Sequence, residues 1–204
     1  MKVVGSDARG LAEAAEALRA GEVVAYPTET VYGLGVDPFS EAAVERLFAL
    51  KGRAPDNPVL LVAADLAQVE AVVSELSPKA LVCADAFWPG PLSLLLSRSG
   101  KLPEVVTAGL PKVCVRCTAD DVARRLCQAF GGALTSTSAN VSGGAPACCL
   151  EDIKLDGITI GVDGGKLDAS LPSTVYDPDL DEVVRAGVIS EHELRQRMAR
   201  AEGE

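Results

Sequence analysis

Histidine is nearly absent from this sequence: the single one, His192, lies near the C-terminus on a predicted surface helix. Ser-His-Asp and Cys-His hydrolases need an imidazole beside the nucleophile, so the shortage argues against such an enzyme. Long apolar runs are also absent, which excludes a transmembrane helix. Residues 1–7 lack the apolar core of a secretion signal, and we expect a cytoplasmic protein without membrane contact.

Positive charge is in deficit, since 19 Lys and Arg face 29 Asp and Glu for a net charge of −10. A protein whose main task is to grip nucleic acid carries a basic face, because phosphate contacts dominate that binding. The acidic balance therefore argues against a general RNA-binding module. It leaves room for a local basic cleft.

The familiar nucleotide-binding signatures are missing as well. The chain has no GxxxxGK[ST] P-loop, no strand–GxGxxG–helix unit and no protein-kinase motif set. A nucleotide would have to be held by side chains and by loops at the ends of strands.

Six cysteines are present, including a CxxC formed by Cys114 and Cys117 and the adjacent pair Cys148 and Cys149. The CxxC lies in a predicted strand, where residues three apart point to opposite faces. No glycine or histidine helps to form the tight turn of a zinc knuckle. We expect core or incidental cysteines and no metal site.

Strand-like and helix-like segments alternate along the 204 residues, which fit one domain over 1–204. The alternation predicts an α/β fold with a twisted mixed sheet and flanking helices. Helices are predicted at 7–20, 40–51, 65–73, 77–87, 118–130 (with Thr118 opening a capping box) and from Ser190, and strands at 22–26, 59–62, 92–96, 113–117, 133–135, 158–162, 173–176 and 182–185.

Two polar clusters lie beside strand-like runs: Lys51 and Arg53 before one, and residues 136–140 after another. Two cations opposite hydroxyls and an amide suit a polyphosphate, since lysine supplies a compact charge and arginine a planar fork. Alternatively, the first cluster is a solvated helix end and the second a turn. For either cluster alone, that simpler interpretation is favoured.

Other polar features also allow two interpretations. The loop 27–35 either brings backbone close to a ligand or forms an ordinary tight turn. Segment 87–91 is expected to shape a corner rather than bind a ligand. Glu29 resembles a general base, but we expect a solvated loop acid. Arg116 lies in an apolar strand and should meet a carboxylate of the protein or a substrate, because an unpaired buried cation is costly.

In this order, the polar segments resemble the YrdC family, the L-threonylcarbamoyladenylate synthases. The matching stretches are YPTETVYGLG (26–35), KGRAPDNPVLLV (51–62), FWPGPLSLLL (87–96), VCVR (113–116), STSANVSGGAP (136–146), PSTVYD (172–177) and VVRAGVIS (183–190). Each is weak alone, but all of them in order are specific, and they span nearly the whole chain. The length resembles the short single-domain form of the family.

The resemblance implies a YrdC-like α/β fold with a concave, positively charged cavity. It implies a nucleotidyltransferase that makes threonylcarbamoyl-AMP and pyrophosphate from L-threonine, bicarbonate and ATP, with Mg²⁺ expected. The product would serve a downstream threonylcarbamoyl transferase machinery in tRNA modification, with weak tRNA or RNA contact a further option.

The same resemblance implies roles for individual residues. Lys51 and Arg53 are expected to be catalytic, by neutralising charge on the phosphates. No protein nucleophile is needed, because a carbamate formed on threonine attacks the α-phosphate, so catalysis is positioning and charge neutralisation. The residues expected to bind the nucleotide are Lys51, Arg53, Ser138, Asn140 and Arg185, and those expected around threonine are Thr30, Arg116 and Ser173.

The chain departs from the family pattern at prolines: Ala54, Thr118 and Ala186 replace usual prolines, and Thr137 a common one. No charged group or donor is lost, so nucleotide binding should survive, whereas altered loops leave threonine specificity open.

Two alternatives to a threonylcarbamoyl-AMP synthase remain. One is a paralogue with another acyl or amine substrate. The other is a non-catalytic RNA-binding or ribosome-maturation protein.

Overall fold

A computed structural model describes residues 1–54, 56–141, 143–168 and 170–201. The strands in chain order are β1 (Lys2–Gly5), β2 (Val24–Tyr26), β3 (Gly33–Gly35), β4 (Leu60–Ala63), β5 (Leu92–Ser97), β6 (Lys112–Cys117), β7 (Leu134–Ser138), β8 (Ile160–Asp163), β9 (Thr174–Asp177) and β10 (Glu182–Arg185). They form one ten-stranded sheet in the order β1-β8-β2-β3-β7-β4-β6-β5-β9-β10. At its centre β4 runs parallel to β6 and antiparallel to β7. The predicted mixed sheet is confirmed.

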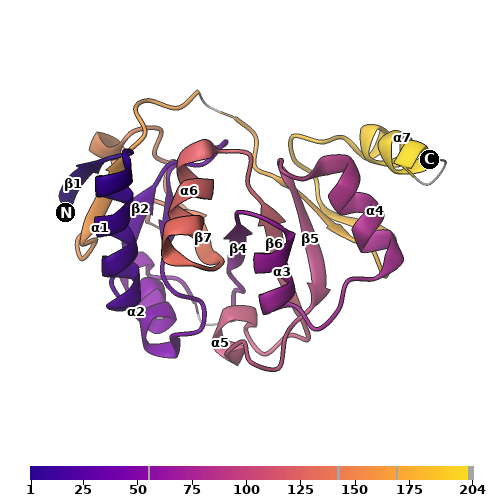
Figure 1. Cartoon of the computed structure of the whole chain (residues 1–204), viewed down its shortest axis with the longest axis horizontal. Coiled ribbons are helices and arrows are strands. Elements are labelled where there is room, and N and C mark those ends of the chain that lie inside the picture. Colours follow the sequence, from indigo (N-terminus) through magenta and orange to yellow (C-terminus); the bar gives the residue numbers. More distant parts are fainter. Residues whose placement is uncertain (55, 142, 169, 202–204) are drawn as a thin grey trace.

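The helices flank this sheet (Figure 1). They are α1 (Ala8–Arg19), α2 (Glu41–Lys51), α3 (Leu66–Val72), α4 (Pro78–Phe87), α5 (Glu104–Thr107), α6 (Asp121–Phe130) and α7 (Glu191–Ala201), with a short 3₁₀ helix at Leu150–Asp152. Short polar side chains begin α1 and α4 as predicted: Asp7 accepts a hydrogen bond from the Gly10 N–H at 2.8 Å, and Ser77 precedes Pro78 at the first position of α4.

One part of the core lies beneath α1 and α6, which are side by side over the strands in Figure 1. Leu18 of α1 and Leu126 of α6 are fully buried in the same cluster as Tyr26 and Val62. The helical spacing of Leu11, Ala14 and Leu18 on α1 places these side chains on the same buried face. This packing holds β2 and β4 in place.

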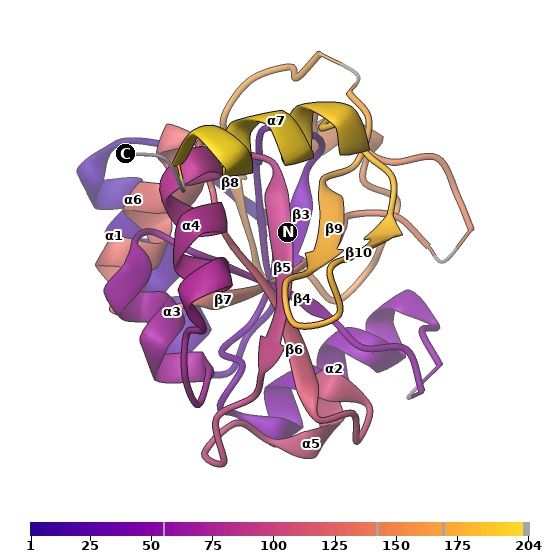
Figure 2. The ribbon, with the colours of Figure 1, turned by 90° about the vertical axis from the view of Figure 1, so that its right-hand side faces the viewer.

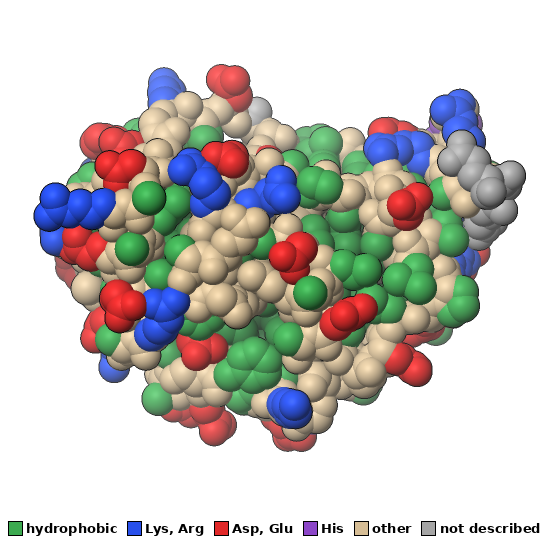
Figure 3. Space-filling view, in the orientation of Figure 1, with side chains coloured by type: hydrophobic (Ala, Val, Ile, Leu, Met, Phe, Trp, Pro, Cys, Tyr) green, Lys and Arg blue, Asp and Glu red, His purple; other side chains and the backbone are tan. Residues whose placement is uncertain are grey.

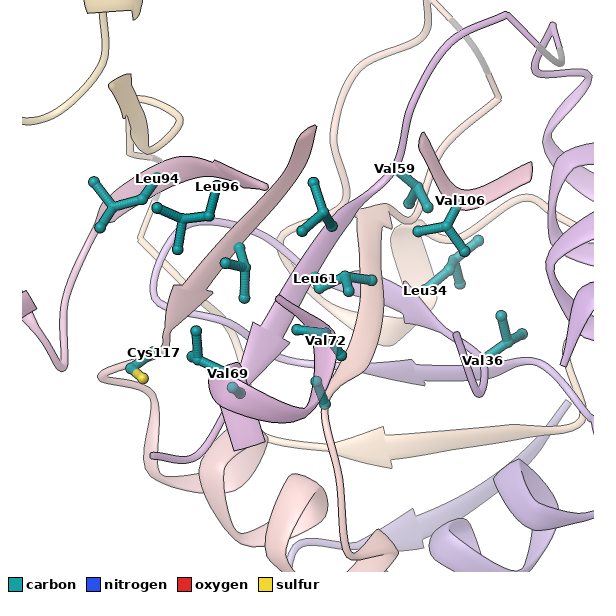
Figure 4. Packing of buried hydrophobic residues seen from close by; sticks show 14 of the residues in the cluster. Leu34, Val36, Val59, Leu61, Val69, Val72, Leu94, Leu96, Val106 and Cys117 are labelled. Carbon is teal, nitrogen blue, oxygen red and sulfur yellow. The ribbon is translucent and has the colours of Figure 1, made fainter. Parts of the chain in front are cut away.

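The larger part of the core surrounds β4, β5 and β6 (Figure 4). Val59 meets Val106 of α5, and the Val59 N–H donates to the Val106 carbonyl at 2.9 Å. Val69 and Val72 of α3 lie in the same cluster as Leu61. These buried contacts make the central strands a rigid support for the polar residues at their ends.

Strand β7 is longer than the sequence predicted. Its predicted end was residue 135, but residues 136–138 continue the strand, with Ser136 opposite Leu60 of β4 and Ser138 opposite Gly33 of β3. The interpretation of these residues as a turn is therefore wrong. Strands β1 and β3 and helix α5, each only three or four residues long, were not predicted either.

Strand β3 fits between β2 and β7 because Gly35 has no side chain. A Cβ atom at Gly35 would lie 2.7 Å from the Tyr26 ring and 3.1 Å from the Thr135 carbonyl oxygen. Only a residue without a side chain allows such close packing between β2 and β7. Glycine has low strand propensity, so the requirement arises from tertiary packing.

Helix α6 begins two residues later than predicted. The carboxylate of Asp120 caps it by accepting from the Ala123 N–H at 2.8 Å. Thr118 is therefore not the N-cap, and its hydroxyl donates to Glu29 at 2.7 Å. The predicted capping box at Thr118 is wrong because Asp120 competes for the same helix end.

The β9–β10 hairpin is fastened beside α4 and α7 (Figure 2). Asp181, in the hairpin turn, accepts from the Tyr176 hydroxyl and forms ion pairs with Arg195 of α7 and, at 2.7 Å, with Lys79 of α4. This network fixes the hairpin that carries Arg185. Within the described ranges, each helix is too short or too polar to span a lipid bilayer.

Candidate active site

A cavity of about 560 Å³ lies among the central and C-terminal strands. Its size falls within the range usual for small-molecule sites. Among the described lining residues, three arginines (Arg53, Arg116 and Arg185) contribute side chains, and no Asp or Glu does. The predicted positive potential of the cavity stays a prediction. On the face shown in Figure 3, acidic and basic side chains are interspersed.

A second cavity of about 270 Å³ adjoins the first, and Thr30, Val31, Ser138 and Pro172 line both. Asn140 lines the smaller one. Polar residues 136–138 at the end of β7, together with Asn140, therefore face two adjoining cavities. Such a shape can hold an extended ligand with polar groups along its length.

Lys51 joins the two polar clusters. It is the last residue of α2, only 2% exposed, and its ammonium donates to the carbonyl of Asn140 at 2.7 Å and to that of Ser138. Residues 89 positions apart in the chain thus meet, as predicted. Lys51 is not among the residues lining either cavity, so its charge lies behind the wall formed by the end of β7.

Burial lowers the pKa of Lys51 to about 8 from 10.5, helped by the charge of Arg53. The unfolded chain keeps this proton up to the ordinary pKa, so between pH 8 and 10.5 it binds more protons than the folded chain. The contribution of Lys51 to stability therefore rises with pH in that window.

We expect the unfolding free energy of the wild type, relative to that of Lys51→Met, to rise by about 3 kcal/mol as the pH increases through this window. Urea unfolding of both proteins at pH 7.5 and pH 10.5 measures it. A difference that stays constant between the two pH values would contradict the lowered pKa of Lys51.

Arg53 is held at the cavity wall by several acceptors. Its Nη2 donates to the Asn57 side-chain oxygen at 2.9 Å and to the Pro58 carbonyl at 2.6 Å, and its Nη1 to the Thr137 hydroxyl at 3.3 Å. Its guanidinium lies 5.9 Å from the centre of the Phe48 ring. Asn57 was not predicted, although it lies in the KGRAPDNP stretch and lines the cavity.

The side chain of Asn140 folds back on its own loop. Its amide nitrogen donates to the carbonyls of Val141 and Gly144, each at 2.8 Å. Its Oδ1 is buried and accepts no hydrogen bond from any described residue. A buried acceptor without a donor is unusual in proteins, which suits a group that receives a donor from a ligand.

Arg116 meets a carboxylate, as predicted. Its Nη1 lies 2.5 Å from Oε1 of Glu29. Glu29 also accepts from the Thr118 hydroxyl and, at 3.2 Å, from the Ala119 N–H. The expectation that Glu29 is a solvated loop acid is wrong, because these partners hold its side chain at only 16% exposure.

Arg185 reaches the cavity from β10. Its Nη2 donates to the Ser173 carbonyl at 2.9 Å and to the Ser173 hydroxyl at 3.1 Å. That hydroxyl also lies 2.9 Å from the hydroxyl of Ser93, which is fully buried in β5. Ser93 was not predicted, and its only signal in the sequence is a serine within the apolar run 92–96.

Hydrogen bonds within the loop before β3 fix the position of Thr30. The Thr28 hydroxyl donates to the Val31 carbonyl at 2.7 Å and lies 3.2 Å from the Thr30 hydroxyl. Both threonines line the 560 Å³ cavity and are buried. The loop is therefore a tight turn that also presents hydroxyls to the cavity.

The two CxxC cysteines point to opposite faces of β6, as predicted. Cys114 lines the 560 Å³ cavity, whereas Cys117 belongs to the core. Burial raises the pKa of the Cys114 thiol to about 11, which keeps it neutral and poorly nucleophilic at neutral pH. Among the described residues, no disulfide forms and no group of three His, Cys, Asp or Glu could hold a metal ion.

Comparison with known proteins gives consistent matches. A Sua5/YciO/YrdC family model, described as "Telomere recombination", matches residues 16–187. The "Threonylcarbamoyl-AMP synthase" of Cellvibrio japonicus is 39% identical over 178 residues, covering 84% of this chain and 93% of that protein. The protein of the same name from Pyrococcus abyssi is 40% identical over 167 residues, covering 80% of this chain.

The crystal structure of P. abyssi Sua5 complexed with L-threonine superposes with a TM-score of 0.91 at 33% identity. It covers 97% of this chain and 61% of that one. The chain thus spans about half the length of the curated P. abyssi relative, of which 49% is matched, and nearly all of the C. japonicus relative.

Proposed function

Because this chain belongs to the Sua5/YciO/YrdC family, we propose that it catalyses the formation of threonylcarbamoyl-AMP and pyrophosphate from L-threonine, bicarbonate and ATP. The activity is that of a nucleotidyltransferase. The observation that carries the proposal is the meeting of the Lys51–Arg53 region with the end of β7 at a cavity lined by three arginines.

In this proposal, the nucleotide lies against Arg53, Ser138, Asn140 and Arg185. Arg53 and Arg185 offer planar donors that suit phosphate oxygens. Lys51 acts from behind the wall, by fixing the carbonyls of Ser138 and Asn140 and by adding a positive charge beside them.

Threonine would occupy the part of the cavity near Thr30, Arg116 and Ser173. Arg116 would bind the carboxylate of the amino acid, because arginine recognises carboxylates through paired N–H groups. The hydroxyls of Thr30 and Ser173 would orient the remainder of the substrate. All three residues line the same 560 Å³ cavity.

The reaction proceeds in two balanced steps. The amine of threonine attacks bicarbonate, a C–N bond forms, and water leaves to give a carbamate. A carbamate oxygen then attacks the α-phosphorus of ATP, the bond to the β-phosphate oxygen breaks, and pyrophosphate leaves with the electron pair. The cations of the site lower the barrier by neutralising charge on the phosphates, so no protein nucleophile is used.

Mg²⁺ in proteins is commonly held by one or two carboxylates together with substrate phosphates. Among the described residues, neither a cluster of potential metal ligands nor a carboxylate in the cavity lining offers a resident site. We therefore treat Mg²⁺ as part of the substrate, entering as the complex with ATP.

The proposal is tested by incubating the protein with MgATP, bicarbonate and each amino acid and following pyrophosphate release. We expect release that depends on both threonine and bicarbonate. Release with another amine instead of threonine would identify a paralogue with a different substrate. No release, together with salt-sensitive binding to tRNA, would support a non-catalytic RNA-binding protein.

The proposed reaction also implies a partner enzyme that uses its product. Threonylcarbamoyl-AMP is a reactive mixed anhydride, so the proposal includes a downstream threonylcarbamoyl transferase that consumes it in tRNA modification. A cytoplasmic location, a single domain over residues 1–204 and weak contact with tRNA are parts of the same proposal.

A further inference from the structure

Thr118 lies at the junction of β6 and α6 and is fully buried. Its hydroxyl donates to Oε2 of Glu29 at 2.7 Å, and the next backbone N–H, that of Ala119, donates to Oε1 at 3.2 Å. The Glu29 carboxylate therefore receives donors from two consecutive residues. Glu29 itself is not among the residues that line the cavity.

Glu29 in turn holds Arg116, which lines the cavity and is only 3% exposed. Within the described ranges, Glu29 is the one carboxylate that forms an ion pair with Arg116. The buried Nε and Nη1 of Arg116 form no hydrogen bond with any described residue, so Nη1 meets Glu29 through the ion pair alone. The guanidinium thus has Nη1 in an ion pair with Glu29, while its Nε–H group has no acceptor among the described residues.

We propose that Thr118 is a positioning residue for amino-acid recognition, acting through Glu29 on Arg116. The inference rests on the proposed function, in which Arg116 receives the substrate carboxylate. The Thr118 hydroxyl holds the Glu29 carboxylate behind Arg116 and turns the unpartnered edge of the guanidinium toward the substrate. A planar fork recognises a carboxylate only in a narrow range of orientations, so losing this support misaligns it.

The alternative is that Thr118 only fills space at the junction of β6 and α6. Valine has nearly the shape of threonine but lacks the donor, whereas serine keeps the donor and loses a methyl group. The two substitutions therefore separate the hydroxyl from packing. Thr107→Val is a matched control, because Thr107 is also fully buried and lines neither cavity described above.

The experiment measures threonine binding by calorimetry and the KM values for threonine and ATP from pyrophosphate release. We expect Thr118→Val to raise the Kd and KM for threonine about 10-fold or more, the size expected when a hydrogen bond to a charged group is lost. The KM for ATP stays within about twofold of wild type, the scatter expected of an uncoupled site. Thr118→Ser and Thr107→Val bind threonine like wild type.

Three outcomes overturn the inference. If the wild type binds no threonine, the proposed function and this inference both fail. If the wild type turns threonine over and Thr118→Val does so equally well, only the inference fails. If Thr118→Ser is impaired as much as Thr118→Val, or the two KM values rise together, Thr118 acts through packing alone. Thermal unfolding of each variant shows whether it is folded at the assay temperature.

Discussion

Lys51→Met lowers kcat/KM for ATP by about 10²–10³-fold, which is the size of effect seen when one preorganised charge-stabilising group is removed. The ammonium of Lys51 holds the carbonyls of Ser138 and Asn140 and places a charge beside the end of β7. Methionine fills similar space but has neither the donors nor the charge. Pyrophosphate release at pH 7, with ATP varied, measures the effect.

The matched control is Lys101→Met, since Lys101 is exposed and lies in the loop before α5. We expect its kinetics to equal those of the wild type. If Lys51→Met retains activity within about threefold, a change far below the expected range, its charge is not used by the reaction. If it is unfolded at the assay temperature, Lys51 is needed for the fold.

Arg116→Met has the second large effect, and it acts on stability as well as activity. Removing one partner of a buried ion pair leaves the other charge unpaired, so the unfolding free energy is expected to fall by about 3–5 kcal/mol. Threonine-dependent turnover is expected to fall by about 10²-fold or more, because the carboxylate of the substrate loses its charged partner. Urea unfolding and pyrophosphate release measure the two effects.

The double variant Arg116→Met with Glu29→Gln separates the effect on stability from the effect on turnover. A glutamine at position 29 carries no charge. Its side-chain oxygen can still accept from the Ala119 N–H and its amide nitrogen can donate to the Thr118 hydroxyl, so most of the stability should return. Turnover should not return, because no guanidinium is present. Recovery of turnover together with stability would show that Arg116 serves only the fold.

The local structure of this chain follows well from its sequence. Asp7 and Ser77 cap the helices they were expected to cap, and α2 ends at Lys51 with Gly52 in the left-handed conformation. These features depend on contacts within about four residues, so a short window of sequence contains the physics that decides them. Thr118 was wrongly predicted to cap α6, because its hydroxyl donates to Glu29, which is distant in the sequence.

The candidate site was only partly predictable. Residues with a distinctive motif, such as Arg53 and Asn140, were found, whereas Asn57 and Ser93 were missed. Ser93 forms its hydrogen bond across neighbouring strands to Ser173, 80 residues away, and nothing near it in the sequence indicates that partner. Short strands such as β3 depend on packing in the same way.

The sequence by itself determined the alternation of strands and helices, the helix caps and the family to which the chain belongs. Only the tertiary structure decided what the charged groups do: the Lys51 ammonium is held by carbonyls of the β7 end, and Glu29 is withdrawn behind Arg116. Lys51 lies 89 positions from Asn140 in the chain, and Glu29 lies equally far from the Thr118 hydroxyl that holds it. Helix caps are decided by neighbours in the chain, whereas the partner of a buried charge is whatever the folded sheet brings beside it.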